Sequence, residues 1–152
     1  MGKARGGEHG AMTDDAPGGL DAALTRIGDR WSLLVVDALL GGPRRFGELQ
    51  EDLDGIATNV LAQRLKHLER LALVVATPYS QRPPRYRYGL TAAGQELAGA
   101  VRLLTHWGAE RAGTTASGLR HEACGTTPEA RWYCPTCSRL VTDDELGELT
   151  FI

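Results

Sequence analysis

Residues 58–73 carry the most regular alternation of apolar and polar positions in the chain. Leu61, Leu65 and Leu68 recur at spacings of four and three, which places them on one face of a helix. The opposite face is polar and holds Asn59, Gln63, Lys66 and His67, with Arg64 and Arg70 beside it. Most of these groups can donate a hydrogen bond to a base edge or a phosphate. The pattern predicts an amphipathic helix, capped by Thr58 or the loop before it, whose polar face is either simply solvated or binds a partner.

Three shorter helices are predicted upstream of this one. Residues 20–28 place apolar side chains on one side only, whereas residues 31–40 are apolar on nearly all sides and should occupy the centre of the core. Glycines and a proline at 41–43 end the second helix. The third, 46–53, turns Phe46, Leu49 and Leu53 inward, and a short turn then leads to the helix 58–73. A short helix, a tight turn and a longer helix with a polar outer face are typical of a helix-turn-helix.

A basic hairpin is predicted directly after the long helix. Residues 73–79 favour a strand, 80–85 form a proline-rich basic loop, and 86–91 alternate like a returning strand. A hairpin in this position is typical of a wing, here 79–87, and its arginines would reach the DNA backbone or minor groove. The alternative is an ordinary solvent-exposed hairpin.

The distribution of charge supports a polyanionic partner. The whole chain has a net charge of −2, yet residues 58–90 hold six basic groups and one acidic group, which leaves −7 for the remainder. Positive charge concentrated on one segment of an acidic protein steers a polyanion to that segment.

Length and composition limit the class of protein. A chain of 152 residues can hold one domain with a core and an appendage. No apolar run approaches the roughly 20 residues that a membrane span needs, and the polar, glycine-rich start is unlike a secretory signal, so we expect a cytoplasmic protein. No paired carboxylates, nucleophile and base, or phosphate loop with supporting context indicate an enzyme.

Residues 20 to about 110 resemble the HxlR-type winged helix-turn-helix regulators of bacteria. The resemblance rests on IGDRWSLLVVDALLGGPRRFGELQ, then GIATNVLAQRLKHLERLALV, then RPPRYRYGLTAAGQEL. It implies a homodimeric DNA-binding repressor or activator, with the first and last helices forming the dimer interface. Two features depart from the family. Pro17-Gly18-Gly19 stand where many members carry a cysteine, which some of them use as a redox sensor, and Ala57-Thr58-Asn59 stand where Ser-Pro-Arg or a similar sequence is common.

These considerations select a set of DNA-binding candidates. The expected major-groove base contacts are Thr58, Asn59, Gln63 and Lys66. The expected phosphate or minor-groove contacts are Arg44, Arg45, Arg64, Arg82 and Arg85. No feature of the sequence indicates a small-molecule effector, and neither the operator nor the sign of regulation follows from it.

The last long helix of the winged domain is predicted to begin after Thr91, over 91–112. Leu97, Val101, Leu104 and Trp107 form its apolar stripe. A monomeric domain would leave little to cover this stripe, so the helix is a candidate for dimerisation together with the first helix.

The segment 119–142 has a different character, because it contains all three cysteines of the chain. The spacing His121-x2-Cys124-x9-Cys134-x2-Cys137 supplies two ligand pairs, and a Cys3His set suits one structural, tetrahedral zinc ion per chain. An odd number of cysteines argues against a disulfide framework. The order of residues also differs from that of a zinc deaminase.

The predicted architecture is therefore mainly α with a small β-hairpin wing (α+β): a winged helix-turn-helix followed by a zinc ribbon. The expected segments are a disordered arm (1–19), the DNA-binding and dimerisation domain (20–112), a linker (113–118), a zinc-ribbon-like segment (119–142) and an acidic tail (143–152). Two alternative functions remain at this point. One is a transcriptional switch in which the Cys3His site responds to metal or oxidants, and the other is a protein-interaction module that acts through the ribbon.

Overall fold

The computed structural model describes residues 18–113 and 120–146. Most of the expected N-terminal arm, nearly all of the expected linker and the end of the acidic tail lie outside these residues. The first described part contains the helices α1 (Gly19–Ile27), α2 (Arg30–Leu40), α3 (Phe46–Asp52), α4 (Thr58–Arg70), α5 (Ala92–Glu96) and α6 (Ala98–Ala112), with the strands β1 (Arg44–Arg45), β2 (Val74–Gln81) and β3 (Pro84–Leu90). The second contains β4 (Trp132–Cys134), β5 (Arg139–Val141) and the 3-10 turn η1 (Asp143–Glu145).

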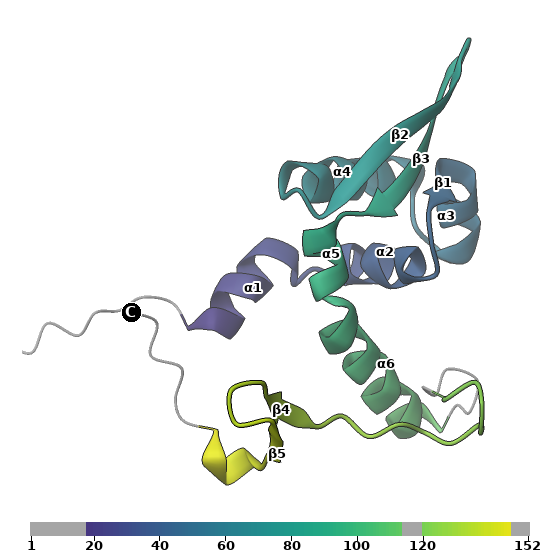
Figure 1. The fold of residues 1–152 in the computed structure, drawn as a ribbon. Helices are drawn as coiled ribbons and strands as arrows, with labels where there is room; N and C mark the ends of the chain where they lie inside the picture. The colour runs from purple at the N-terminus through teal and green to yellow at the C-terminus, as the bar shows by residue number, and fades with distance from the viewer. Residues whose placement is uncertain (1–17, 114–119, 147–152) are drawn as a thin grey trace, which may run out of the picture.

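The elements of the first part form a winged helix. Helices α2, α3 and α4 pack together, the β2–β3 hairpin projects beyond them, and α6 leads away from the other side (Figure 1). In the described residues the chain thus has the expected α+β architecture, with the predicted short helix, turn and long helix followed by a hairpin.

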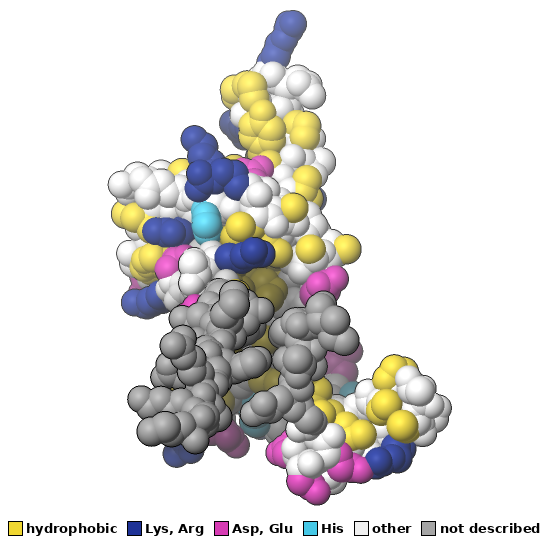
Figure 2. All heavy atoms as spheres, turned by 90° about the vertical axis from the view of Figure 1, so that its left-hand side faces the viewer, with side chains coloured by type: hydrophobic (Ala, Val, Ile, Leu, Met, Phe, Trp, Pro, Cys, Tyr) yellow, Lys and Arg dark blue, Asp and Glu magenta, His cyan; other side chains and the backbone are white. Residues whose placement is uncertain are grey.

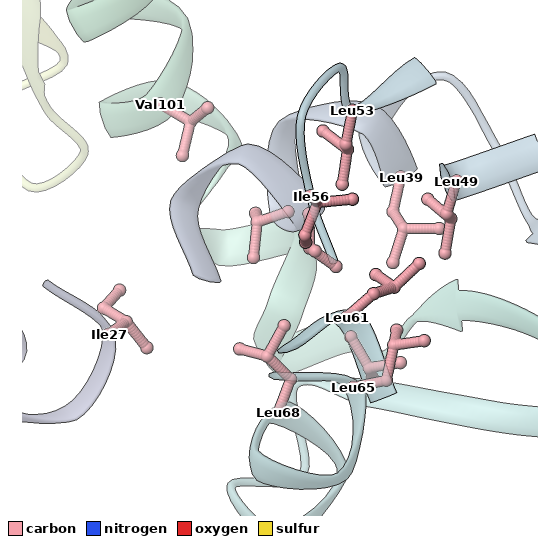
Figure 3. Close-up of a cluster of buried hydrophobic side chains, with 12 residues drawn as sticks. Ile27, Leu39, Leu49, Leu53, Ile56, Leu61, Leu65, Leu68 and Val101 are labelled. Carbon is pink, nitrogen blue, oxygen red and sulfur yellow. The ribbon is translucent and has the colours of Figure 1, made fainter. Parts of the chain in front are cut away.

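The core is built around α2, as its apolar composition predicts. Val35 and Val36 have no exposed surface, and Leu39 is 1% exposed. Around them lie buried leucines from the two helices of the helix-turn-helix, and Figure 3 shows several of these side chains pointing toward one another. They are Leu49 and Leu53 from the α3 region and Leu61, Leu65 and Leu68 from α4. This packing fixes which face of α4 is turned to solvent.

The end of α4 differs from the prediction, because the helix stops at Arg70 instead of residue 73. Ala72 adopts a left-handed conformation (φ 56°), its amide donates to the Glu69 carbonyl (2.9 Å), and the Leu73 amide donates to the Leu68 carbonyl (3.0 Å). This pair of bonds is a Schellman motif, which usually has glycine at the left-handed position. Because alanine stands at this position, no glycine marks the end of the helix in the sequence, and the leucine spacing predicted a helix that continues to residue 73.

The wing also differs in detail. The strands pair in the order β1-β3-β2, and the predicted loop at 80–85 is largely strand, because Ser80 pairs with Arg85 and Gln81 with Pro84. Only Arg82 and Pro83 lie between the strands. Pro84 is tolerated because it is the first residue of its strand. Arg44 and Arg45, which lie between the second and third predicted helices, form a short strand against β3.

The predicted helix over 91–112 is interrupted at Leu97, which separates α5 from α6. Thr91 caps α5 as expected, accepting a hydrogen bond from the Gly94 amide (3.1 Å). Its hydroxyl donates in turn to the Ala72 carbonyl (2.6 Å). A Cβ atom at Gly94 would collide with the Leu73 carbonyl oxygen, so only glycine allows α5 to pack this closely on the end of α4.

Candidate DNA-binding surface

The outer face of α4 presents the four predicted base-contacting side chains to solvent. Thr58, Asn59, Gln63 and Lys66 are all exposed, while Leu61, Leu65 and Leu68 on the opposite face are at most 1% exposed. The packing of the leucines on α2 and α3 therefore orients the polar face outward. Gln63 and Lys66 also line a shallow hollow of about 820 Å³ along this face.

Two capping positions were predicted for α4, namely Thr58 and the loop before it, and Thr58 does not cap the helix. The capping position is Ala57, in the loop before it, and it makes no side-chain cap bond. Thr58 instead accepts a hydrogen bond from the Gln50 side-chain amide of α3 (2.7 Å). Gln50 was not among the predicted site residues. Its bond occupies one lone pair of Thr58 and leaves the hydroxyl hydrogen free to donate outward.

Arg64 lies at the edge of this face and is turned toward the body of the domain. Its Nε is 3.4 Å from Asp29 Oδ1. Asp29 caps α2 by accepting from the Ser32 amide (3.0 Å). Burial acts to raise the pKa of Asp29, but the hydrogen bonds from Ser32 and the charge of Arg64 together hold that pKa below its ordinary value. Any phosphate contact by Arg64 must compete with this ion pair.

His67, which the helical pattern places on the polar face, is engaged inside the protein. Its Nε2 lies 2.7 Å from the Arg26 carbonyl oxygen at the end of α1. Arg64 and His67 are three residues apart on α4 and hold Asp29 and Arg26 respectively. The corner between α1 and α2 is thus fastened to one side of the helix by two polar contacts.

The two arginines before α3 also have partners within the protein. Arg44 Nε is 3.7 Å from Asp52 Oδ2. The Arg45 guanidinium lies over the Tyr79 ring of the wing, 4.8 Å from the ring centroid. Their phosphate contacts remain a prediction, and both side chains are already engaged by other residues of the domain.

The wing presents the other two predicted backbone contacts. Arg82 at the tip and Arg85 on β3 are exposed, as is Arg87. Figure 2 shows basic side chains gathered over the upper part of the molecule and at the tip of the hairpin. A duplex lying along α4 would therefore meet positive charge on the helix and on the neighbouring wing.

Apolar side chains are also exposed on α1 and on α6. The side chains of Leu20 (74%), Leu24 (54%), Leu104 (58%) and Trp107 (60%) are largely exposed. Only Ile27 of α1 is buried, and Val101 and Ala109 are the buried residues of α6. The two helices predicted to form a dimer interface thus carry uncovered apolar stripes.

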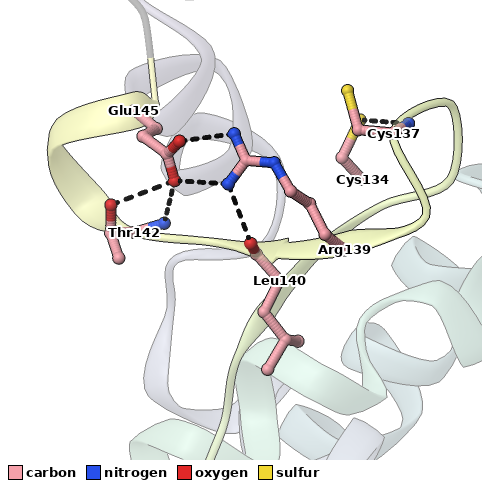
Figure 4. A network of polar contacts seen from close by, with 6 residues as sticks. All are labelled: Cys134, Cys137, Arg139, Leu140, Thr142 and Glu145. Atoms are coloured by element: carbon pink, nitrogen blue, oxygen red, sulfur yellow. Dashed lines mark hydrogen bonds and ion pairs between the residues drawn. The ribbon is translucent and has the colours of Figure 1, made fainter.

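The predicted zinc ligands form two separate pairs. His121 Nδ1 lies 3.3 Å from Cys124 Sγ, and the Cys137 amide donates to Cys134 Sγ (3.5 Å; Figure 4). Hydrogen bonds from Thr126 and His121 lower the pKa of the Cys124 thiol, and those from Cys137 lower the pKa of Cys134. Within 18–113 and 120–146, however, no three His, Cys, Asp or Glu side chains converge on one metal position.

The end of this segment is held by an ion pair. Arg139 Nη2 is 2.5 Å from Glu145 Oε1, and the Thr142 amide donates to Glu145 Oε2 (3.0 Å; Figure 4). The hydrogen bonds from Arg139 and then Thr142 lower the pKa of Glu145 to about 2. The contact closes η1 onto β5 beside the second cysteine pair.

Comparison with known proteins identifies the fold. Residues 26–115 match the model of the HxlR-like helix-turn-helix family. The chain belongs to this family. The match runs from the end of α1 through α6 and so contains the candidate DNA-binding residues of α4 and the wing, whereas residues 120–146 lie beyond it.

Relatives of this HxlR-like protein are transcriptional regulators. An uncharacterised HTH-type transcriptional regulator of Mycobacterium tuberculosis is 39% identical over 79% of this chain and 77% of its own. A candidate transcription factor from Pseudomonas aeruginosa is 32% identical and superposes with a TM-score of 0.63, over 83% of this chain and 87% of that one. The redox regulator HypR in its oxidised form is 28% identical, with a TM-score of 0.57 over 60% of this chain and 94% of its own.

These matches confirm the regulator prediction at the level of the family. The HxlR-like chain is a DNA-binding transcriptional regulator and not an enzyme. None of the helices in the described part has the length and apolar character needed to cross a bilayer.

Proposed function

We propose that this HxlR-like regulator binds a specific DNA sequence as a homodimer, with α4 in the major groove and the wing on the backbone or minor groove. The observation that carries the proposal is the polar face of α4. Four exposed hydrogen-bonding side chains lie opposite three buried leucines and beside a basic hairpin. An α-helix fits the major groove of B-DNA, where each base pair has a distinct pattern of donors and acceptors.

The side chains on this face suit base recognition. Asn59 and Gln63 can each pair with an adenine through two hydrogen bonds, and Lys66 can donate to guanine acceptors. Thr58, whose oxygen accepts from Gln50, is left with a donor for a base or a phosphate. Phosphate contacts come first from Arg82 and Arg85, which are exposed on the wing. Arg44, Arg45 and Arg64 contribute less, because each is already engaged by Asp52, Tyr79 or Asp29.

The homodimer accounts for the apolar stripes on α1 and α6. Two such stripes related by a two-fold axis would cover each other and present two α4 helices to one side of the duplex. For dimers that read the major groove with a helix, half-sites lie one helical turn apart, roughly 34 Å, or a multiple of it. A pseudo-palindromic operator follows from this symmetry.

A structural zinc ion is proposed for the C-terminal segment, held by His121, Cys124, Cys134 and Cys137. The donor set fits, because three thiolates and one imidazole match tetrahedral zinc and the pKa values of Cys124 and Cys134 are lowered. The two pairs must come together to hold one ion. Bound zinc would supply most of the free energy of folding of this small segment, because it has few apolar side chains to bury.

A second candidate function is a switch in which these thiols respond to metal or oxidants. It is favoured by the exposure of Cys124 and Cys137. In this mechanism, losing the metal or oxidising the thiols changes DNA affinity. A purely structural site leaves DNA affinity unchanged once the winged domain is folded.

The experiment is selection of bound duplexes from a random pool, with zinc content measured on the same sample. A palindromic consensus and about one zinc per chain support the proposal. Failure to enrich any sequence would contradict specific binding. Repeating the measurement with peroxide or a chelator separates the two roles of the metal site, because only the switch predicts altered affinity.

A further inference from the structure

We propose that the stacked pair Arg45 and Tyr79 is a latch that sets the angle of the wing against α3, so that Tyr79 positions Arg82 and Arg85 for DNA. The inference rests on the proposed function, because it assumes that the wing contacts the duplex. It assigns a role to Tyr79, which no motif singled out, and changes the role of Arg45 from phosphate contact to positioning residue.

A β-bulge turns Tyr79 out of the ladder. Pro78 pairs with Tyr86 and Ser80 pairs with Arg85, so Tyr79 is the extra residue on β2. A bulge leaves its extra residue without a cross-strand partner and re-aims the side chain. Here the ring faces the guanidinium of Arg45, 4.8 Å from the ring centroid, although 44% of the residue stays exposed.

Arg45 is held from the other side by α3. Its amide donates to Glu48 Oε2 (2.6 Å), its Nε is 4.0 Å from Glu48 Oε1, and it pairs with Arg87 in the β1–β3 ladder. The backbone of Arg45 is thus tied to the start of α3 while its guanidinium covers the wing tyrosine. The contact joins the helix-turn-helix to the hairpin at the bulge.

The surroundings favour positioning over direct phosphate binding. A hollow of about 560 Å³ separates α3 from the wing and is lined by Arg45, Tyr79 and Arg85. Glu48 and Glu51 line the same hollow. Glu48 also pairs with Arg45 (4.0 Å), so the Arg45 guanidinium is engaged by a carboxylate and by the Tyr79 ring and is less available to a phosphate.

The direct test compares Tyr79→Leu with Tyr79→Phe, using the selected duplex and the full chain. An exposed cation–π contact corresponds to a roughly two- to fivefold change in an equilibrium. We expect Tyr79→Leu to weaken DNA binding by about that factor or more. It should also lower the slope of log K against log salt, by about 0.9 for each phosphate that the wing no longer reaches. Tyr79→Phe keeps the ring and should behave as the wild type.

Coupling to Arg85 separates positioning from a simple loss of stability. If the latch presents Arg85, then Arg85→Ala costs less affinity in the Tyr79→Leu background than in the wild type. Tyr86→Leu, which removes a 45% exposed tyrosine from the facing strand, is the matched control and should leave the effect of Arg85→Ala intact. Full additivity of Tyr79→Leu with Arg85→Ala would overturn the latch.

Hydrogen exchange of the free protein tests the latch independently of DNA. Tyr79→Leu should speed exchange in residues 79–87 while exchange in α2 and α4 stays the same. Unchanged exchange in the wing would overturn the inference. If the wild type bound no duplex specifically, the proposed function would fail, and the exchange experiment alone would still decide whether the latch exists.

Discussion

His67 Nε2 lies 2.7 Å from the carbonyl oxygen of Arg26, 41 residues earlier in the chain. The bond joins α4 to the last turn of α1, where the carbonyl has no partner within its own helix. Ile27 is the only side chain of α1 that is buried, and this bond adds a polar contact that holds α1 against α4. Since α1 also carries exposed leucines, His67 links the candidate dimer surface to the candidate DNA surface.

Replacing His67 with alanine should lower the free energy of unfolding by about 1 kcal/mol, the net contribution of one such hydrogen bond. Urea denaturation measures it. His67→Gln keeps an N–H donor and should recover part of the loss. Arg26→Ala should have little effect, because the acceptor is the backbone carbonyl. Equal stability of wild type and His67→Ala would mean that water replaces the bond without cost.

His67 and Arg64 also show where the sequence stops being informative. The leucine spacing correctly predicted the buried face of α4 and the exposure of Asn59, Gln63 and Lys66. It could not predict what lies against the edges of that face. The partners of Arg64 and His67 come from the corner between α1 and α2, and no local pattern encodes a contact over that separation.

A contact between distant residues explains the difference at β1, and the residue type at position 72 explains the difference at the end of α4. Arg44 and Arg45 become a strand because β3 lies beside them, which is a long-range pairing. Ala72 ends α4 in a left-handed conformation. Glycine or asparagine is usual in this conformation, so alanine at position 72 did not indicate the end of the helix. For the C-terminal segment, the structure brings His121 close to Cys124 and Cys134 close to Cys137, while their binding of one metal ion remains a prediction.

Gly94 offers a test of the close packing of α5 against the end of α4. Gly94→Ala places a methyl group against the Leu73 carbonyl oxygen, well inside van der Waals distance, so the backbone must shift. We expect a loss of about 1–3 kcal/mol, as for other overpacked sites. Gly99→Ala is the control, because no atom lies within 4 Å of its Cβ position. In the α6 helix it should be neutral or stabilise by up to roughly 1 kcal/mol. Thermal unfolding of both variants measures the two changes in stability.

Trp107 tests the proposed dimer. Its side chain is 60% exposed on α6, so Trp107→Glu should leave the fold intact and shift the protein to monomer by putting a charge into an apolar interface. Light scattering after size exclusion measures the mass. Trp132→Glu, at an equally exposed tryptophan (59%) of the C-terminal segment, should keep the dimer. A Trp107→Glu variant that stays dimeric would place the interface elsewhere.

The zinc proposal is tested with ligand variants. Cys134→Ser should reduce the zinc content from about one per chain to a small fraction, because a thiolate ligand is removed. His121→Cys should retain zinc, since four cysteines form an equally good tetrahedral site. Elemental analysis after dialysis gives the stoichiometry. A Cys134→Ser variant that keeps its full zinc content would contradict the proposed zinc site.

The most direct test of the central claim is the DNA affinity of Gln63→Ala and Arg85→Ala, measured over a range of salt on the selected duplex and on single-base variants of it. We predict that Arg85→Ala weakens binding to every duplex by a similar factor and lowers the salt slope by about 0.9. Gln63→Ala should instead lose about 1–3 kcal/mol of discrimination at one base pair, with little change in salt slope. If both variants bind every duplex as the wild type does, neither α4 nor the wing reads DNA.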